Sequence, residues 1–251
     1  MPLLAAFLTP LVGRLGPRVR DVFVIVALAI VQILVIIVAR DVYANGIQVY
    51  TLGAAAPTLA IPETHMVPVR IILEVDGLGA FMGLMGATVA LAGAIYSISC
   101  MKIETGQDRF YTLLLLLAAS MVGIQYTGDL FNLFVFLEIL SISGAALAGF
   151  RTRFVDAVEG GFKYVIVSTV AALLVLISVG MFYGQYNLLN IAAIADAMQY
   201  TAIDKIALVL LVVALLTKSG AVPSHWWVPD TYTPAPGGTS PIIYGASLTC
   251  L

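Results

Sequence analysis

Residues 128–150 read GDLFNLFVFLEILSISGAALAGF, an apolar run in which Glu138 is the one acidic residue after the leading Gly-Asp pair. A helix needs about 20 apolar residues to cross the hydrocarbon core of a bilayer. Leu130–Phe150 is therefore predicted to be a membrane span. Glu138 is the ninth residue of this span, so at 1.5 Å per residue it lies roughly 12 Å along the helix, near the middle of the bilayer.

The whole chain has the composition of a membrane protein. Of its 251 residues, 61% are hydrophobic and 10% are charged, whereas soluble domains carry roughly 25% charged residues. This deficit excludes a soluble enzyme, a nucleic-acid-binding protein and a disordered tail. The net charge of −2 comes without a basic tail, so no nucleic-acid partner is indicated. The expected fold is all-α, a polytopic transmembrane helical bundle in the cell membrane.

Hydropathy predicts seven spans and a C-terminal stub. The first span is marginal because it is short and contains Pro10. We expect two parts, residues 1–76 with two spans and an extracytoplasmic loop, and residues 77–251 with the remaining bundle. The predicted spans are Leu3–Val12, Val22–Val38, Leu78–Ser99, Phe110–Tyr126, Leu130–Phe150, Phe162–Tyr183 and Ile206–Pro223, and the stub is Pro241–Leu251.

Two connections are long enough to hold structure of their own. Within Asp41–Asp76, the segments Gly46–Leu52 and Val69–Val75 flank a Pro-containing turn, and the second alternates with a period of two. This pattern predicts a small hairpin on the membrane surface. The second connection, Asn187–Ile203, is predicted to contain a short interfacial helix.

The positive charges separate onto two sides of these spans. One side holds seven cations, and the other holds only Arg40, Arg70 and Lys205. By the positive-inside rule, the cation-rich side is cytoplasmic and the N-terminus is outside. The apolar Met1–Val12 has no cationic region before it, so we expect a retained membrane segment rather than a cleaved signal. The seven cations are Arg14, Arg18, Arg20, Lys102, Arg109, Arg151 and Arg153.

Two charges, Glu138 and Lys218, fall well inside predicted spans, whereas Lys163 lies at the start of the span Phe162–Tyr183. A charge at the bilayer centre costs roughly 2.5–3.5 kcal/mol even on translocon-derived scales. Such groups persist when they pair, face water or carry function. One interpretation is a structural salt bridge between two helices. The other is a proton or cation relay, in which the movable lysine and the acid alter one another's protonation.

Further ionisable residues near span ends also have two interpretations. Lys163 follows Glu159 by four residues, which fits a surface ion pair or a second relay base. Asp129 is expected to cap the helix that starts at Leu130.

Gly220 and Pro223 after Lys218 predict a broken helix, which membranes tolerate where it lines protein or water. His225 beyond the break fits either a proton donor or a hydrogen-bonded structural residue.

Neither a metal site nor a cofactor site is predicted. Cys100 and Cys250 lie far apart and form no CxxC pair, and His65 and His225 share no ligand spacing with them. The cysteines of an iron–sulfur cluster and a Gly-rich nucleotide loop are missing from the sequence. We therefore expect no cofactor, no metal and no catalytic centre in this chain. Trp226 and Trp227 are expected to be interfacial anchors rather than ligands.

Three separated stretches resemble one family. They are Gly128–Gly144 (GDLFNLFVFLEILSISG), Phe162–Ser168 (FKYVIVS) and Lys218–Pro236 (KSGAVPSHWWVPDTYTPAP). They resemble the antiporter-like membrane subunits of respiratory complex I, of Mrp-type cation/proton antiporters and of membrane-bound hydrogenase-like complexes. The amino-acid sequence of the first stretch is most similar to the branch formed by the Mrp D-type subunits. The similarity runs from about Val69 to the end, in the right order on the right spans.

The resemblance implies a set of ion-translocation residues and partners. Glu138, Lys163 and Lys218 match the family's glutamate and two lysines, and His225 and Asp230 match the histidine and aspartate of its motif after the broken helix. In the family these groups form a water-linked axis at mid-membrane. The partners implied are other membrane subunits, further antiporter-like subunits among them, and in some complexes a peripheral redox module.

The sequence departs from the family pattern at three places. Thr231-Tyr232 replace the second histidine of the motif, and Thr249 stands where the family has a lysine. The family also continues into a second, inverted helix bundle, so this chain resembles the first half of such a subunit. We therefore expect an H⁺- or Na⁺-translocating subunit of a respiratory or antiporter complex. The alternative is a structural or coupling subunit that conducts no ions, and a free-standing transporter is disfavoured because such folds pair two repeats.

Overall fold

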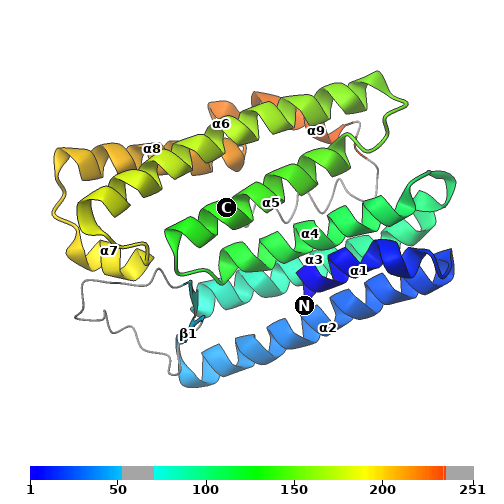
Figure 1. Cartoon of the computed structure of the whole chain (residues 1–251), viewed down its shortest axis with the longest axis horizontal. Coiled ribbons are helices and arrows are strands. Elements are labelled where there is room, and N and C mark those ends of the chain that lie inside the picture. The colour runs from blue at the N-terminus through cyan, green and yellow to red at the C-terminus, as the bar shows by residue number, and fades with distance from the viewer. Residues whose placement is uncertain (53–70, 234, 236–251) are drawn as a thin grey trace.

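The computed structural model describes residues 1–52, 71–233 and 235. These residues form a bundle of roughly parallel and antiparallel helices with a two-stranded hairpin near one end (Figure 1). The predicted stub and His65, Arg70, Thr249 and Cys250 lie outside the described residues. The elements are α1 (Pro2–Gly13), α2 (Pro17–Asn45), β1 (Gln48–Thr51), β2 (Ile72–Val75), α3 (Gly77–Cys100), η1 (Met101–Ile103), α4 (Gln107–Gln125), α5 (Leu130–Ala148), α6 (Val155–Tyr186), α7 (Ile191–Ala197), α8 (Ala202–Lys218), η2 (Ser224–Trp226) and α9 (Trp227–Tyr232).

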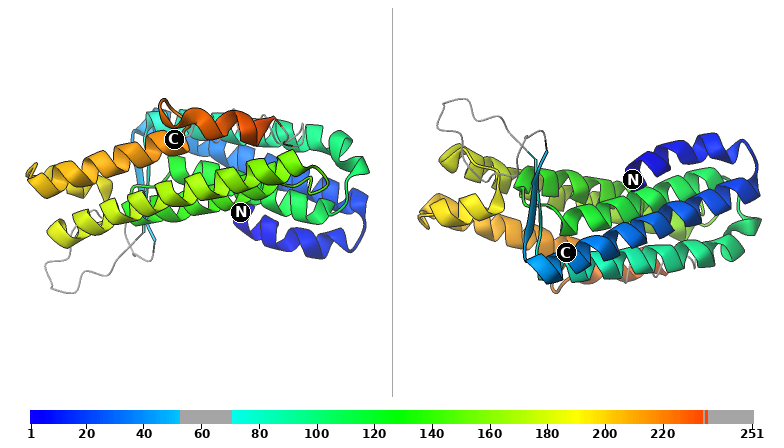
Figure 2. Two further views of the ribbon diagram at one scale, coloured as in Figure 1. Left: turned by 90° about the horizontal axis from the view of Figure 1, so that it is seen from above. Right: turned by 90° about the horizontal axis from the view of Figure 1, so that it is seen from below.

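The structure confirms a membrane bundle, although it does not confirm a count of seven spans. Among the described residues, four helices are long and apolar enough to cross a bilayer, namely α2, α3, α5 and α6. Helix α1 has 12 residues, which is about 18 Å at 1.5 Å per residue. Its N-terminus lies part-way along the bundle (Figures 1 and 2).

Helix α4 lies at the centre of the described bundle because its neighbours cover most of its circumference. It packs against α1, α3 and α5, and α6 packs against α5 on one side and α8 on the other. The α4 side chains that form the core are apolar through several turns, and Leu114, Leu115 and Leu117 are completely buried. Helix α4 therefore forms the core of the part of the bundle built by α1, α3 and α5.

A hairpin and a short helix are both present in the connections where the sequence predicts them. Strands β1 and β2 pair antiparallel, with Gln48 opposite Val75, and α7 lies within the predicted 187–203 connection. Both lie at the same end of the bundle (Figure 1). They meet the α4–α5 turn at Gly128, whose N–H donates to the Ile72 carbonyl at 3.0 Å and whose carbonyl accepts from the Ile191 N–H at 2.9 Å.

The opposite end of the bundle gathers the cations. Arg20 at the start of α2 is buried and pairs with Asp108 of α4 at 2.9 Å. Glu104, which follows η1, pairs with Arg151 at 3.1 Å and with Arg153 at 2.6 Å. These ion pairs bring the α3–α4 and α5–α6 connections together. They show that the cation-rich connections separated by the sequence share one end of the fold.

The broken helix is confirmed. Helix α8 ends at Lys218, and after five residues the chain continues as η2 and α9. Gly220 has a positive φ of 66°, a conformation that glycine adopts without steric cost. The expectation for Trp227 as an interfacial anchor is wrong, because Trp227 is fully buried while Trp226 is 59% exposed.

Candidate functional site

Lys218 lies against α5, within one helical turn of Glu138. Its side chain is buried, with 3% of the residue exposed. The Nζ atom donates hydrogen bonds to the Leu137 carbonyl at 3.3 Å and to the Ser141 hydroxyl. These two acceptors flank Glu138 in sequence. The ammonium group therefore sits beside the acid while bonded to neutral oxygens.

The hydrogen-bond partners of Lys218 come from α5 and not from the break after α8. Carbonyl groups of the last turn of α8 already accept other hydrogen bonds. The Leu215 and Leu216 carbonyls accept from the N–H groups of Ser219 and Ala221, at 2.8 and 3.0 Å. The Thr217 carbonyl accepts from the Gly220 N–H and from the indole Nε1 of Trp227, at 3.2 and 3.3 Å. The break therefore turns the chain back, and α5 provides the acceptors.

Glu138 is half-buried on α5. Its Oε1 atom is buried and has no hydrogen-bond partner among the described residues. No ion pair joins Glu138 to Lys218 in the described part of the chain, so the two groups are neighbours rather than a closed salt bridge. A buried carboxylate oxygen without a partner is energetically costly, which marks this position as one that needs water, a cation or the lysine.

An aromatic stack fixes the helix break against the rest of the bundle. The rings of Tyr164 on α6 and Trp227 on α9 lie nearly parallel, with centroids 4.9 Å apart and planes 5° apart. On its other side, Tyr164 meets α5 at Gly144, where an added Cβ would come within 2.8 Å of the ring. Gly144 lies three residues after Ser141, so the stack braces the same part of α5 that holds Lys218.

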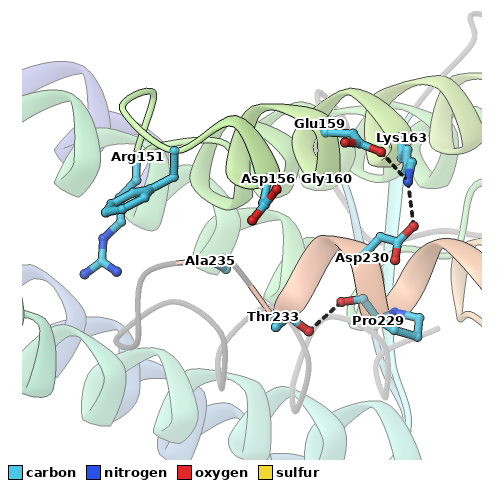
Figure 3. Close-up of a pocket in the computed structure, with 10 residues that line it drawn as sticks. Arg151, Asp156, Glu159, Gly160, Lys163, Pro229, Asp230, Thr233 and Ala235 are labelled. Carbon is cyan, nitrogen blue, oxygen red and sulfur yellow. Dashed lines mark hydrogen bonds and ion pairs between the residues drawn. The ribbon is translucent and has the colours of Figure 1, made fainter.

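Lys163 on α6 forms a second charged cluster with α9. Its Nζ atom lies 2.7 Å from a Glu159 carboxylate oxygen and 2.6 Å from Asp230 Oδ2 (Figure 3). The expected surface pair with Glu159 is thus present, and Asp230 adds a contact between helices that sequence spacing did not predict. Helix α9 approaches α6 closely at Gly160, whose missing Cβ would clash with the Asp230 carbonyl oxygen.

A pocket of about 570 Å³ opens beside this cluster. It lies between the α5–α6 connection, the first turns of α6, and α9 (Figure 3). Its walls are rich in charge, and Lys163 points from α6 toward Asp230 on α9 (Figure 3). This is the end of the bundle that carries the cations. The lining residues are Arg151, Phe154, Asp156, Glu159, Gly160, Lys163, Pro229, Asp230, Thr233 and Ala235.

The structure separates His225 and Asp129 from the buried lysine. His225 lies in η2 and is exposed in the isolated chain. Asp129 is the N-cap of α5, as predicted, and accepts from the Asn132 N–H at 2.8 Å. Burial raises the pKa of the Asp129 carboxyl, although the Asn132 N–H bond opposes that rise. Asp129 therefore starts the helix that carries Glu138.

The sequence pointed to the helices that carry Glu138 and Lys218, but not to two features that hold them together. These are the Ser141 hydroxyl and the stack of Tyr164 on Trp227. Ser141 was not singled out because a serine inside an apolar helix commonly bonds its own preceding turn, as this one also does to the Leu137 carbonyl. The Tyr164–Trp227 stack was missed because its partners are 63 positions apart. The spacing of Ser141 and Gly144 was a weak signal, since small residues three positions apart mark one narrow face of α5 next to Glu138.

Comparison with known proteins identifies the domain. Residues 127–250 match the family model described as NADH:quinone oxidoreductase/Mrp antiporter, TM. The chain is 35% identical over 176 residues to NADH-quinone oxidoreductase subunit N of Desulforudis audaxviator, covering 67% of this chain and 35% of that protein. It is 27% identical over 238 residues to the D-type subunit of the Na(+)/H(+) antiporter of Alkalihalophilus pseudofirmus, covering 92% of this chain and 45% of that one.

Solved structures share the fold. The membrane-bound sulfane sulfur reductase, an archaeal respiratory membrane complex, matches with a TM-score of 0.84 and 26% identity over 99% of this chain and 50% of that chain. The Mrp complex from a Dietzia species matches with a TM-score of 0.82 and 24% identity over 98% of this chain and 44% of that chain. The chain thus spans half or less of the length of these relatives. Together, these matches show that this membrane protein carries the transmembrane domain of the NADH:quinone oxidoreductase/Mrp antiporter family.

Proposed function

We propose that the chain is an H⁺- or Na⁺-translocating membrane subunit of a multi-subunit respiratory or antiporter complex. In this proposal it works beside other membrane subunits, further antiporter-like ones among them, and in a respiratory complex a peripheral redox module supplies the driving force. The named relatives are an oxidoreductase subunit and an antiporter subunit. The shared transmembrane domain supports a common ion-translocating role, with the reaction that drives it left to other subunits.

The proposed path joins the charged pocket to the centre of the bundle. Lys163 and Asp230 would exchange the ion with the cation-rich end, and Lys218 and Glu138 would hold it at mid-membrane. The η2–α9 segment supports this connection because it contacts both places. Trp227 bonds the Thr217 carbonyl next to Lys218, and one turn later Asp230 bonds Lys163. The exposed His225, in the same segment, is proposed as a donor at the path's edge.

The observation that carries the proposal is the state of the two mid-membrane charges. Lys218 is buried on neutral acceptors, and Glu138 keeps a buried carboxylate oxygen free of protein partners among the described residues. A structural clamp would gain its stability from a closed, well-bonded ion pair, because desolvating both charges is costly otherwise. Two adjacent charges that are not closed into a pair suit a site that binds and releases an ion. The purely structural alternative is therefore not favoured.

The topology is part of the same proposal. We propose seven spans with the cation-rich end in the cytoplasm and the N-terminus outside, following the positive-inside rule. The gathering of Arg20, Glu104, Arg151 and Arg153 at one end supports this orientation. Residues 1–76 and 77–251 then remain the proposed two parts, the second forming the start of one antiporter repeat.

The test uses the complex that the tagged chain assembles with in its own membrane, purified and placed in proteoliposomes. H⁺ movement is followed with a pH-sensitive dye, either during redox turnover or after addition of Na⁺. Glu138→Gln and Lys218→Ala are expected to lower transport at least tenfold in fully assembled complex. Asp196→Asn and Lys205→Ala are matched controls, because both side chains are exposed at the hairpin end of the bundle, away from the pocket. Both variants should transport normally.

Two results would count against the proposal. If the Glu138 and Lys218 variants assemble and transport as well as the controls, the residues are not on the ion path. If both variants transport normally once assembled but assembly itself falls, the two residues act as a helix clamp.

A further inference from the structure

Ser141 links Lys218 to α5 through a closed set of hydrogen bonds. The Lys218 amine donates to Ser141 Oγ and to the Leu137 carbonyl, and Ser141 Oγ itself donates to that carbonyl at 2.7 Å. Ser141 is 6% exposed and Lys218 is 3% exposed. The serine hydrogen is therefore directed to Leu137, which leaves the hydroxyl oxygen to accept from the amine.

This arrangement places the lysine next to the acid without bonding it. Residues three apart on a helix are neighbours on its surface, roughly 5–6 Å apart between Cβ atoms. Ser141 and Glu138 have this spacing. A lysine carries its amine on a flexible four-carbon stem, so the amine can pass between these neighbours without any movement of the α5 backbone.

We propose that Ser141 is a positioning residue for ion translocation, which holds the Lys218 amine in a docked position from which it exchanges with Glu138. The inference rests on the proposed function. No proton is transferred in this exchange, because Lys218 keeps its hydrogens and the Ser141 hydroxyl continues to donate to the Leu137 carbonyl. Only the acceptor of the amine changes, from the hydroxyl and carbonyl oxygens to the carboxylate.

A neutral docking group suits this role better than a charged one. The bond from the Lys218 amine to Ser141 has one ionised partner, whereas a bond to a carboxylate joins two opposite charges and adds their Coulomb attraction. A lysine held by a carboxylate alone would therefore leave it slowly. The hydroxyl keeps the buried ammonium bonded while the acid is occupied by its ion. Without the hydroxyl, the docked position loses one acceptor, and the lysine remains longer at Glu138.

The test compares side chains of equal size with and without a hydroxyl. Ser141→Thr keeps the hydroxyl, and Ser141→Val has nearly the same shape as the threonine variant without it. Transport is measured in the reconstituted complex as a function of the concentration of the driving ion or substrate. We expect Ser141→Val to lower the maximal rate about tenfold, which corresponds to the loss of one hydrogen bond to a charged group. Ser141→Thr should retain most of the rate, and KM should stay unchanged in both variants.

Ser143→Ala is the matched control. Ser143 is also buried on the same helix, but it donates to the Ile139 carbonyl at 2.6 Å and the Leu140 carbonyl at 3.2 Å. Its loss should leave transport unchanged. If Ser141→Val does not assemble, Ser141→Ala and Ser141→Cys provide the same comparison of rate against KM.

The outcomes separate this inference from the proposed function. If the Thr, Val and Ala variants at Ser141 all transport at the unmodified rate while Glu138→Gln is inactive, the role of Ser141 is overturned and the ion path stands. Equal loss for Thr and Val would also overturn it, because that result reports packing rather than the hydroxyl. Normal transport by Glu138→Gln would overturn the proposed function itself.

Discussion

Trp226 and Trp227 are neighbours in the chain but have opposite environments, so we expect their replacement by alanine to have very different effects on stability. The Trp227 side chain is fully buried, stacks on Tyr164 and donates to the Thr217 carbonyl, whereas Trp226 beside it is 59% exposed. Truncating a buried tryptophan to alanine typically costs about 3–5 kcal/mol. Trp226→Ala should change the free energy of unfolding by less than about 0.5 kcal/mol, since surface substitutions rarely exceed that.

The conservative variant divides this cost. Trp227→Phe keeps an aromatic ring against Tyr164 but loses the indole N–H. The Thr217 carbonyl still accepts from the Gly220 N–H at 3.2 Å, so it is not left without a donor. We expect a loss of about 0.5–1.5 kcal/mol, the net value of one hydrogen bond, together with a smaller loss from the reduced ring area.

The assay is reversible unfolding of the purified protein in mixed micelles titrated with denaturing detergent, followed by helix content. Transport by the same variants is measured in proteoliposomes, because displacement of Thr217 also displaces Lys218, its neighbour in the chain. Trp227→Ala should be less stable and slower, and Trp226→Ala unaffected in both. If the two alanine variants lose equal stability, the buried stack does not fix the broken helix.

Three further predictions concern the cation-rich end and the contact between α6 and α9. Lys163→Gln removes a partly exposed ion pair with Asp230, and such pairs contribute little to stability. Because Lys163 lies on the proposed ion path, transport should fall while the melting temperature stays constant; a fall in melting temperature alone would contradict this. Gly160→Ala should destabilise by about 1–3 kcal/mol, since the new Cβ meets the Asp230 carbonyl. Gly180→Ala, with nothing within 4 Å of an added Cβ, should be neutral or stabilising in the same melt. Arg20→Met should cost about 1–3 kcal/mol through lost charged hydrogen bonds, and an unchanged unfolding midpoint would refute this.

Local sequence signals predicted the elements well, because each depends on residues close in the chain. Asp129 precedes the apolar run of α5 and caps it, as an aspartate with free backbone N–H groups ahead of it should. The alternation before Val75 predicted β2, and Gly220 with Pro223 predicted the break. Span length was the weaker guide, since α1 has only 12 helical residues.

The contacts of the candidate site depend on how helices pack, which periodicity does not determine. The cost of charge in lipid singled out Glu138 and Lys218, and the structure places Lys218 against the turn of α5 that carries Glu138. The sequence argument does not predict that Lys218 bonds Ser141 and the Leu137 carbonyl, because those bonds depend on the rotation of α8 against α5. The burial of Trp227 depends likewise on the approach of α9 to α6.

The central claim is that the ion path passes Lys218, which requires water to reach this position inside the bundle. It is tested most directly by thiol labelling in reconstituted complex in which Cys100 and Cys250 of this chain are replaced by serine. Thiolsulfonate reagents react with ionised thiols in water, so Lys218→Cys is expected to react far faster than Val209→Cys, because Val209 is 61% exposed on the apolar surface of α8. Equal, negligible labelling of both variants, with Asp196→Cys labelled normally, would contradict the account.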